Sequence, residues 1–241
     1  MNYGPNTIFG PHTLFTAARF GVLHDLERLI KDGANIEDRD GGPFDRTALF
    51  HAVMGNHVDV TRALLKNGAD VMSIDNGGWK PLHAAVIFKS KECVSLLLEY
   101  DADVWAEQRF GSTPLHWGTF FDNFEMLRIL ISKAVAVSYP MTDYQTRVMQ
   151  SVMKDAIIAG HNSCVKLLLV EAHVDIDYAM STAEQYKRRV IIRMFRRELQ
   201  WREMCLAFGM GNMKRLGDNS LVRLLDVGVV DMIMKFYANP S

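Results

Sequence analysis

Apolar residues recur along the first three quarters of the chain in pairs of short segments, at a spacing of three and four residues that is typical of helices. The second segment of each pair carries large apolar side chains, and the first carries small ones where it would approach a neighbour closely. The pattern therefore predicts pairs of short helices that share one core. The large apolar positions are Leu26, Leu29, Ile30; Val60, Leu64, Leu65; Val94, Leu97, Leu98; Leu127, Leu130, Ile131; and Val165, Leu168, Leu169.

A four-residue signature marks the first helix of the central pairs. It reads Thr113-Pro114-Leu115-His116, and it stands 33 residues earlier as Lys80-Pro81-Leu82-His83 and, in degraded form, as Thr47-Ala48-Leu49-Phe50. Proline suits the first turn of a helix, where its missing N–H would have no partner and its fixed φ fits the helical backbone. On the same spacing, five units register from Leu14, Leu49, Leu82, Leu115 and Met153.

A period of about 33 residues with Thr-Pro-Leu-His resembles the ankyrin repeat, which is a turn followed by two helices. The resemblance covers roughly residues 12 to 176 and is strongest in units two to four. It implies an all-α fold, an ankyrin-repeat solenoid with hairpin fingers, followed by a C-terminal helical extension. We expect a lead-in over residues 1–11, an array of five units over 12–180, and a C-terminal helical cap or adaptor-binding tail over 181–241.

Some local departures from the pattern carry structural expectations. Gly33 and Gly68 are expected to end second helices in the left-handed conformation, whereas Lys89 and Asp122 stand where the family has glycine between its helices. Leu115 and Met153 are 38 residues apart, which predicts a longer fourth finger around 138–150. A capping box at 181–184 predicts one long amphipathic helix to about Cys205 that closes unit five. The apolar residues over 221–236 predict a final short helix.

Composition and charge exclude several classes of function. The chain has 241 residues and a formal net charge of −1, which gives no global attraction to nucleic acid or to a membrane. It has no apolar run of the roughly 18 residues that a membrane helix needs and no leader pattern, so we expect an intracellular protein, cytoplasmic or nuclear. Cys93 and Cys164 occupy the same repeat position and are interpreted as buried thiols.

The sequence offers no recognisable catalytic, metal or cofactor site. The histidines and cysteines lack paired metal-ligand spacing, and the Gly209-Met210-Gly211 run follows a helix rather than a strand. His83 and His116 fill the fourth motif position, where the family resemblance implies a structural hydrogen-bonding role. We therefore expect a protein that is not an enzyme and needs no cofactor.

The strongest candidate site is a set of large apolar residues in positions that the fold does not require to be apolar. Five and six residues after each motif leucine, the ankyrin family presents its concave binding side. Together with apolar residues in the fingers, these positions predict an exposed patch of the kind that binds protein partners. The alternative is packing against adjacent repeats. The candidate residues are Ile74, Trp79, Ile87, Phe88, Phe110, Phe120 and Phe121.

The function expected is therefore a non-enzymatic protein–protein interaction module that binds a partner through the concave surface. The tail from Trp201 to Leu206, with Leu221 to Asp226, resembles the SOCS box and the F-box-like tail of ankyrin proteins from large DNA viruses. Either would imply a substrate-recruiting subunit of a cullin-type ubiquitin ligase, with a cullin adaptor bound at the tail; a plain cap is the alternative.

A second class of function remains open. The basic helix 187–202 could bind nucleic acid or an anionic surface through its arginines, although Glu184 and Glu198 dilute its charge and a solvated face is favoured.

Overall fold

A computed structural model describes residues 13–137, 140–172 and 174–207. The chain divides into two compact units, Met1–Ile192 and Arg193–Ser241. Over the described residues it is all-helical, with twelve helices and no strand, which confirms the predicted fold class.

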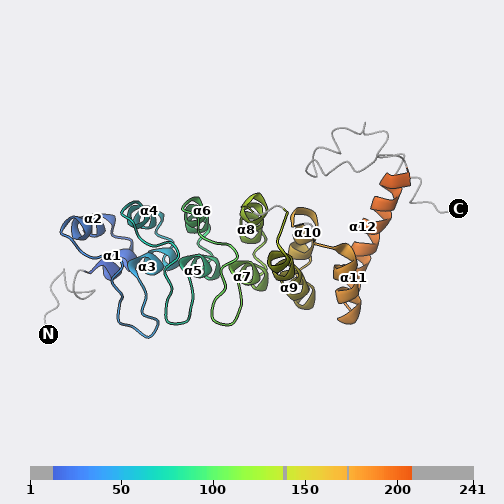
Figure 1. The fold of residues 1–241 in the computed structure, drawn as a ribbon, viewed down its shortest axis with the longest axis horizontal. Helices are drawn as coiled ribbons and strands as arrows, with labels where there is room; N and C mark the ends of the chain where they lie inside the picture. Colours follow the sequence, from blue (N-terminus) through green and yellow to red (C-terminus); the bar gives the residue numbers. More distant parts are fainter. Residues whose placement is uncertain (1–12, 138–139, 173, 208–241) are drawn as a thin grey trace. The chain divides into compact units, whose positions relative to one another are not determined.

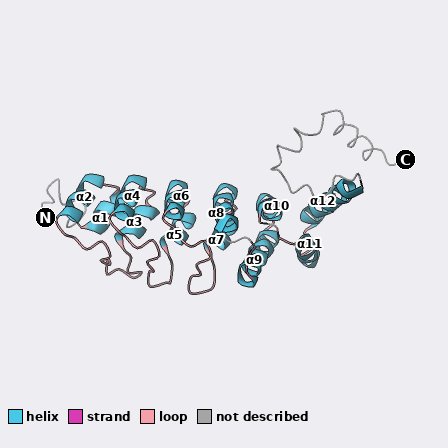
Figure 2. Ribbon diagram, turned by 45° about the horizontal axis from the view of Figure 1, so that its top comes forward, coloured by secondary structure: helices cyan, strands magenta, loops and turns pink. Residues whose placement is uncertain are grey.

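In the first unit the helices form two rows (Figures 1 and 2). Each helix of the inner row packs against the next inner helix, and each helix of the outer row packs against the next outer helix. The inner helices are α1 (Leu14–Phe20), α3 (Ala48–Met54), α5 (Pro81–Ile87), α7 (Pro114–Phe120), α9 (Asp143–Ala159) and α11 (Ile176–Gln185). The outer helices are α2 (Leu23–Lys31), α4 (Val58–Lys66), α6 (Lys91–Glu99), α8 (Phe124–Val137) and α10 (Asn162–Glu171).

Three loops connect the rows and project to the same side of the array (Figure 1). We call the loops at 32–47, 67–80 and 100–113 the first, second and third fingers. We call the surface formed by the inner helices and these fingers the inner surface. The last helix, α12 (Arg189–Ala207), begins in the first unit and continues into the second.

The two helices of each pair are joined by a turn that needs a left-handed residue. This residue is Gly21, Asn56, Lys89, Asp122 or Gly160, with φ of 71°, 54°, 57°, 50° and 81°. The following backbone N–H then returns to the inner helix, as when Ser90 N donates to the Ala85 carbonyl at 2.8 Å. Lys89 and Asp122 therefore keep the conformation that glycine would adopt freely. Gly33 and Gly68 are left-handed, as predicted.

The core lies between the two rows and is built from the predicted periodic positions. Leu97, Leu130 and Leu168 of the outer helices are fully buried, as is the motif leucine Leu115, and Leu82 is nearly so. The thiols of Cys93 and Cys164 are buried as well, in agreement with the sequence interpretation. Stacking of equivalent apolar faces is what holds a repeat array together, because each unit contacts only its neighbours.

The prediction of a longer fourth finger was wrong. The extra residues extend helices at both ends of the connection, because α8 continues to Val137 and α9 begins at Asp143. Thr142 caps α9 by accepting a hydrogen bond from Gln145 N, and Val148 and Met149 are buried on the added turns. The segment has buried apolar positions at helical spacing and lacks the Asn-Gly turn of the second finger, so it folds as helix.

The prediction of one long helix from 181 to 205 was also wrong. Asp175 caps α11, which begins at Ile176 and ends at Gln185. Residues 186–188 form a turn before α12 begins at Arg189. The break repeats the turn of the other pairs: Lys187 is left-handed with φ of 55°, and Arg188 N donates to Ala183 O at 2.9 Å. α11 and the turn that follows it thus repeat the inner helix and the turn of the preceding pairs.

The expected lead-in over 1–11 and the final helix over 221–236 lie outside the described residues, as does the segment from Leu221 to Asp226 of the tail that resembles an adaptor box.

Candidate functional site

Four aromatic side chains make a continuous cluster on the inner surface. The ring centroids of Trp79 and Trp117 are 5.1 Å apart, Trp117 lies 5.7 Å from Phe120 and 6.1 Å from Phe121, and the two phenylalanine rings are 5.2 Å apart. Edge-on and tilted contacts at these distances are favourable for aromatic pairs. We call these four residues the aromatic cluster.

The cluster joins the base of the second finger to α7. Trp79 comes from the finger, and Trp117, Phe120 and Phe121 share one face of α7 or its C-terminal cap because they are spaced by three and four residues. Phe120 is 66% exposed, whereas the other three rings are partly buried by each other and their neighbours. The cluster therefore has one exposed ring, Phe120, in contact with partly buried ones.

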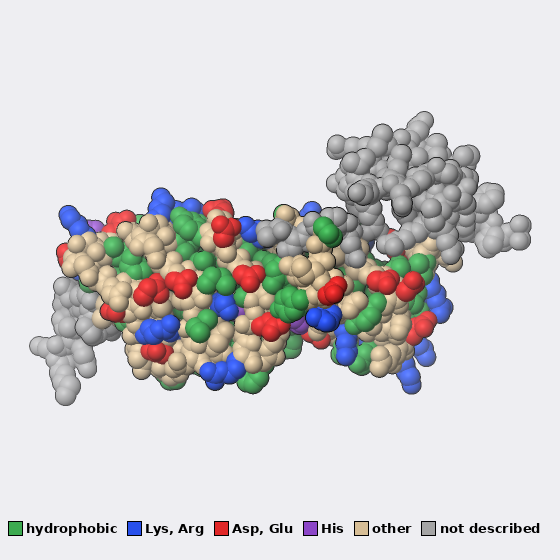
Figure 3. All heavy atoms as spheres, viewed as in Figure 1, with side chains coloured by type: hydrophobic (Ala, Val, Ile, Leu, Met, Phe, Trp, Pro, Cys, Tyr) green, Lys and Arg blue, Asp and Glu red, His purple; other side chains and the backbone are tan. Residues whose placement is uncertain are grey.

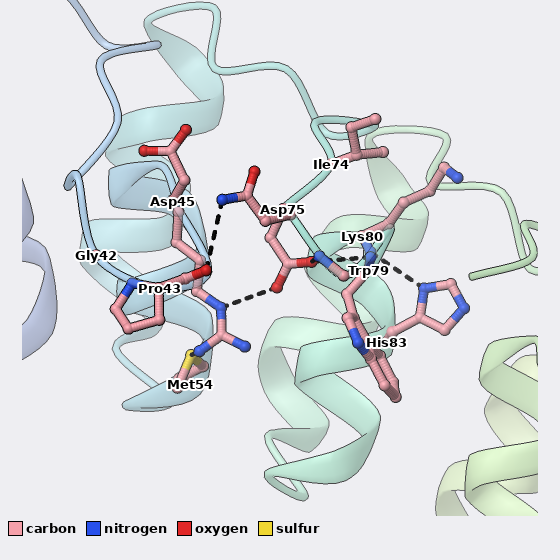
Figure 4. Close-up of polar contacts among 12 residues, drawn as sticks. Gly42, Pro43, Asp45, Met54, Ile74, Asp75, Trp79, Lys80 and His83 are labelled. Carbon is pink, nitrogen blue, oxygen red and sulfur yellow. Dashed lines mark hydrogen bonds and ion pairs between the residues drawn. The ribbon is translucent and has the colours of Figure 1, made fainter. Parts of the chain in front are cut away.

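The second finger holds Trp79 through a buried carboxylate. Asp75 accepts hydrogen bonds from Gly77 N at 2.8 Å and from Trp79 N at 3.0 Å, and its other oxygen pairs with Arg46 Nε at 3.1 Å (Figure 4). The indole lies over Gly77, where an added Cβ would come 2.5 Å from Trp79 Cδ1. The position of the ring thus depends on a glycine and on an ion pair between two fingers.

Sequence analysis missed Trp117, the residue that connects the cluster. It stands two residues after the motif leucine, a position that holds Thr16, His51 and Ala84 in the preceding units. Only the positions five and six after the leucine were considered, although position two lies on the same helical face. Helical spacing from Phe120 and Phe121 back to Trp117 was the signal that could have identified it.

The other predicted residues are placed on the inner surface or its fingers but are outside the ring contacts. Phe110 on the third finger is 86% exposed, Ile74 on the second finger and Phe88 at the end of α5 are each 49% exposed, and Ile87 is partly buried. The structure thus brings together Trp79, Phe120 and Phe121 and leaves the remaining four as separate apolar groups.

Two motif histidines lie in the same region and are structural in their hydrogen bonding. His83 is buried, accepts from Lys80 N at 3.3 Å and bonds Ser112 O at 3.2 Å through Nε2, so it links the second and third fingers. Its ring edge also packs against Trp79, as Figure 4 shows. Burial lowers the pKa of His83 from 6.5 to about 4 and also lowers the pKa of His116. The neutral imidazoles support the finger bases.

The extended N-terminal turns of α9 secure the third finger. The Tyr144 hydroxyl donates to Glu107 Oε1 at 2.8 Å and lies 3.2 Å from Trp105 O. Burial and the contact with the Glu107 carboxylate raise the pKa of Tyr144 to about 12, so it remains a neutral donor. The helical extension that replaces the fourth finger therefore fixes the finger that carries Phe110.

Charged side chains of both signs are interspersed along the array on the face shown in Figure 3. On α12 the side chains of Arg189, Arg193 and Arg197 are exposed. The described part of the chain contains no group of three or more histidine, cysteine or acidic side chains arranged to hold a metal. Nor does any helix in the ranges described combine the length and hydrophobicity needed to cross a membrane.

Comparison with known proteins gives one matching family model, described as ankyrin repeats in three copies, over residues 14–108. Among curated proteins, the Notch-regulated ankyrin repeat-containing protein of Xenopus tropicalis is 32% identical over 85 residues, which is 33% of this chain and 75% of that protein. Its human counterpart is 30% identical over 83 residues, covering 34% of this chain and 73% of the relative.

A further relative, inversin of Gallus gallus, is 35% identical over 89 residues. The aligned segment is 35% of this chain and only 8% of inversin. The segments shared with these three relatives each cover about a third of this chain and leave most of it unmatched.

Proposed function

The chain belongs to the ankyrin-repeat family, and from this premise we propose that it is a non-enzymatic module that binds a protein partner through its inner surface. The aromatic cluster carries the proposal. An exposed large ring is unfavourable in water, and burying one against a partner contributes about 1.5–3 kcal/mol. The side chains of Phe120 and Phe110 are 66% and 86% exposed, so they contribute little to the stability of the repeats.

The geometry supports a defined anchor site for a partner and not a non-specific apolar surface. Trp79, Trp117 and Phe121 are partly buried and held by neighbouring rings, so they are ordered before a partner arrives. Rigid aromatic groups lose little conformational freedom on binding, which is why they dominate the energetics of many interfaces. The surrounding separate groups Ile74, Ile87 and Phe88 would extend the contact.

Alanine substitution at Phe120 or Phe110 tests the proposal most cleanly, because both side chains are exposed and contribute little to folding. Affinity purification of partners with the full chain, followed by calorimetry on those recovered, should show a loss of about 2 kcal/mol for Phe120→Ala. Phe124→Ala is the matched control, since Phe124 is an exposed phenylalanine on the outer helix α8. Equal binding by all three variants would contradict a site on the inner surface.

The finer role, substrate recruitment for a cullin-type ubiquitin ligase, rests on the resemblance of the tail sequence. A full-length chain with Leu224→Asp and Leu225→Asp should lose any cullin adaptor while keeping the inner-surface partner. Loss of neither, or of both together, would argue against a separate adaptor segment in the tail.

The alternative proposal uses the basic helix to bind nucleic acid or an anionic surface. Exposure of Arg189, Arg193 and Arg197 on α12 supports it. Because phosphate contacts release counterions, such binding weakens steeply with salt. Charge reversal at Arg189 and Arg193 should abolish it while leaving the inner-surface partner bound, and a salt titration of any complex separates the two classes.

A further inference from the structure

The second finger contains the dipeptide Asn76-Gly77 in its turn. An asparagine that precedes glycine is prone to cyclise, because the next backbone nitrogen can attack the side-chain amide carbon and glycine has no Cβ to obstruct the approach. The chain has this dipeptide twice, here and as Asn67-Gly68 at the end of α4. The structure gives the two copies different surroundings.

The position of the Trp79 indole requires glycine at position 77. A Cβ added to Gly77 would come 2.5 Å from Trp79 Cδ1, so a side chain there would clash with the ring. The nitrogen of Gly77 is therefore left without a side chain of its own to hinder attack. The packing that orders the aromatic cluster thus keeps a reactive dipeptide in the finger.

A carboxylate contacts the nitrogen that would attack. The backbone N–H of Gly77 donates to Asp75 Oδ1 at 2.8 Å (Figure 4). A general base has to lie within this kind of distance of the proton that it removes. The Asp75 side chain is fully buried, and its other oxygen pairs with Arg46, so the acceptor is held in place. Asp75 is thus positioned to take the proton from the attacking nitrogen.

The amide of Asn76 is held loosely. The residue is exposed, and its Nδ2 donates a long hydrogen bond of 3.4 Å to the Pro43 carbonyl of the first finger. In the other copy, Asn67 Nδ2 donates to a carbonyl of α4 at 2.8 Å, and Gly68 N donates to the carbonyl of Leu65. A carbonyl is a far weaker base than a carboxylate. Asn76 therefore has a loosely held side chain with a base nearby, and Asn67 has neither.

We propose that Asn76 is a site of spontaneous deamidation that Asp75 promotes. The Gly77 nitrogen gives its proton to Asp75 and bonds to Asn76 Cγ. The bond from Cγ to Nδ2 then breaks, and the amide takes up that proton and leaves as ammonia. Water opens the cyclic imide at either carbonyl, which leaves aspartate or isoaspartate at position 76.

The product disrupts the contact between the first and second fingers. A carboxylate at position 76 has no proton to donate to the Pro43 carbonyl, which now accepts from the amide. Isoaspartate also adds one methylene between the two backbone nitrogens that bond to Phe44 O and to Asp75. The turn that positions Trp79 therefore shifts. Weaker partner binding as a result rests on the proposed function, whereas the modification does not.

Peptide mapping of the full-length chain by mass spectrometry, with isoaspartyl methyltransferase to label isoaspartate, tests the proposal. During incubation at neutral pH, Asn76 should convert about tenfold faster than Asn67, which is less than a placed base usually contributes because Asp75 is ion-paired. In urea the two sites should convert at similar rates, since neither keeps its surroundings. Equal rates in the folded chain, or slower conversion of Asn76 folded than in urea, would overturn the proposal.

Asp75→Asn tests the base directly and should slow conversion of Asn76 alone. Unchanged conversion of Asn76 in a folded variant would exclude Asp75 as the base. A variant that fails to fold is identified because both sites then convert at the rate seen in urea, and the ratio of rates in the folded unmodified chain decides the question.

The structural consequence has its own matched pair of variants. Asn76→Asp carries the charge of one product, whereas Asn76→Gln keeps an amide and cannot close the same ring. We expect hydrogen exchange at 77–79 to be faster in Asn76→Asp than in Asn76→Gln, and equal exchange would exclude an effect on the Trp79 turn. None of these measurements uses a partner, so their failure leaves the proposed function standing.

Discussion

The turn between paired helices shows how single residues carry a cost that the repeat imposes. Lys89 is left-handed with φ of 57° and exposed, so its side chain offsets little of the roughly 1–2 kcal/mol that this conformation costs an L-residue. Lys89→Gly should raise the free energy of unfolding by about 0.5–1 kcal/mol, after allowing for the greater entropy of glycine in the unfolded chain. Urea denaturation measures the difference.

Asp122→Gly is the control for that change, because Asp122 occupies the equivalent turn. Aspartate tolerates the left-handed region better than lysine, and Asp122 accepts a hydrogen bond from Cys164 that glycine would remove. Asp122→Gly should therefore bring no gain. Equal stabilisation by both glycines would show that side-chain contacts at these turns contribute nothing.

His83 makes the stability of the finger bases depend on pH. Its pKa is about 4 in the folded protein and near 6.5 in an unfolded chain, so the unfolded state binds more protons between these values. Stability from this group is complete above pH 6.5 and falls as the pH drops towards 4, by up to about 1.4 kcal/mol per pH unit. Denaturation at pH 7 and pH 5 should show a smaller difference for His83→Gln than for the unmodified chain.

Residue positions on the site were predictable only where the repeat defines a slot. Trp79 and Phe121 were found because the family pattern leaves their slots free, and large apolar side chains there are conspicuous. Trp117 was missed since its slot holds small or polar residues in other units, and ring contacts between a finger and a helix depend on packing across repeats. The contact of Gly77 with the Trp79 ring likewise could not be predicted, because it depends on how the second finger folds.

Among the elements, the outer helices contribute large apolar side chains that are fully buried. Leu97 in α6 and Leu130 in α8 are fully buried inside the array. Leu97→Ala or Leu130→Ala should each lower the free energy of unfolding by roughly 2–5 kcal/mol, because each opens a cavity that neighbouring repeats cannot fill. Glu99→Ala, exposed on α6, serves as control and should stay within about 0.5 kcal/mol. A loss for Leu97→Ala as small as for Glu99→Ala would mean that the helix faces are misassigned.

Element boundaries were predictable in the regular units and failed where spacing changed. The 38 residues from Leu115 to Met153 were interpreted as a longer loop, although Thr142 can cap a helix and Val148 and Met149 continue the apolar face of α9. Similarly, the apolar spacing across 181–205 fits one continuous helix. The turn at 186–188 was not predicted, because its left-handed position holds Lys187 and not a glycine. The length of an insertion does not distinguish a longer loop from added turns of helix. The spacing of apolar residues within the insertion does.

At the scale of the whole first unit, α11 is the last helix of the inner row and covers its neighbour α9. α11 packs on α9, and Ala183 of α11 is fully buried. Without α11, the apolar face of α9 would meet water at the end of the inner row. Because stability in a repeat array is a sum of units and neighbour contacts, damage at α11 should spread to its neighbour and stop there.

Ala183→Glu tests this arrangement, since it places a charge in a closely packed site. We expect hydrogen exchange to become faster in α9 and α10 and to stay unchanged in α3 and α4, which contact α11 neither directly nor through one repeat. Ser181→Glu adds the same charge at an exposed position of the same helix and should leave all four helices unchanged. Faster exchange throughout the array would show one cooperative unit, whereas no change in α9 would remove the capping role from α11.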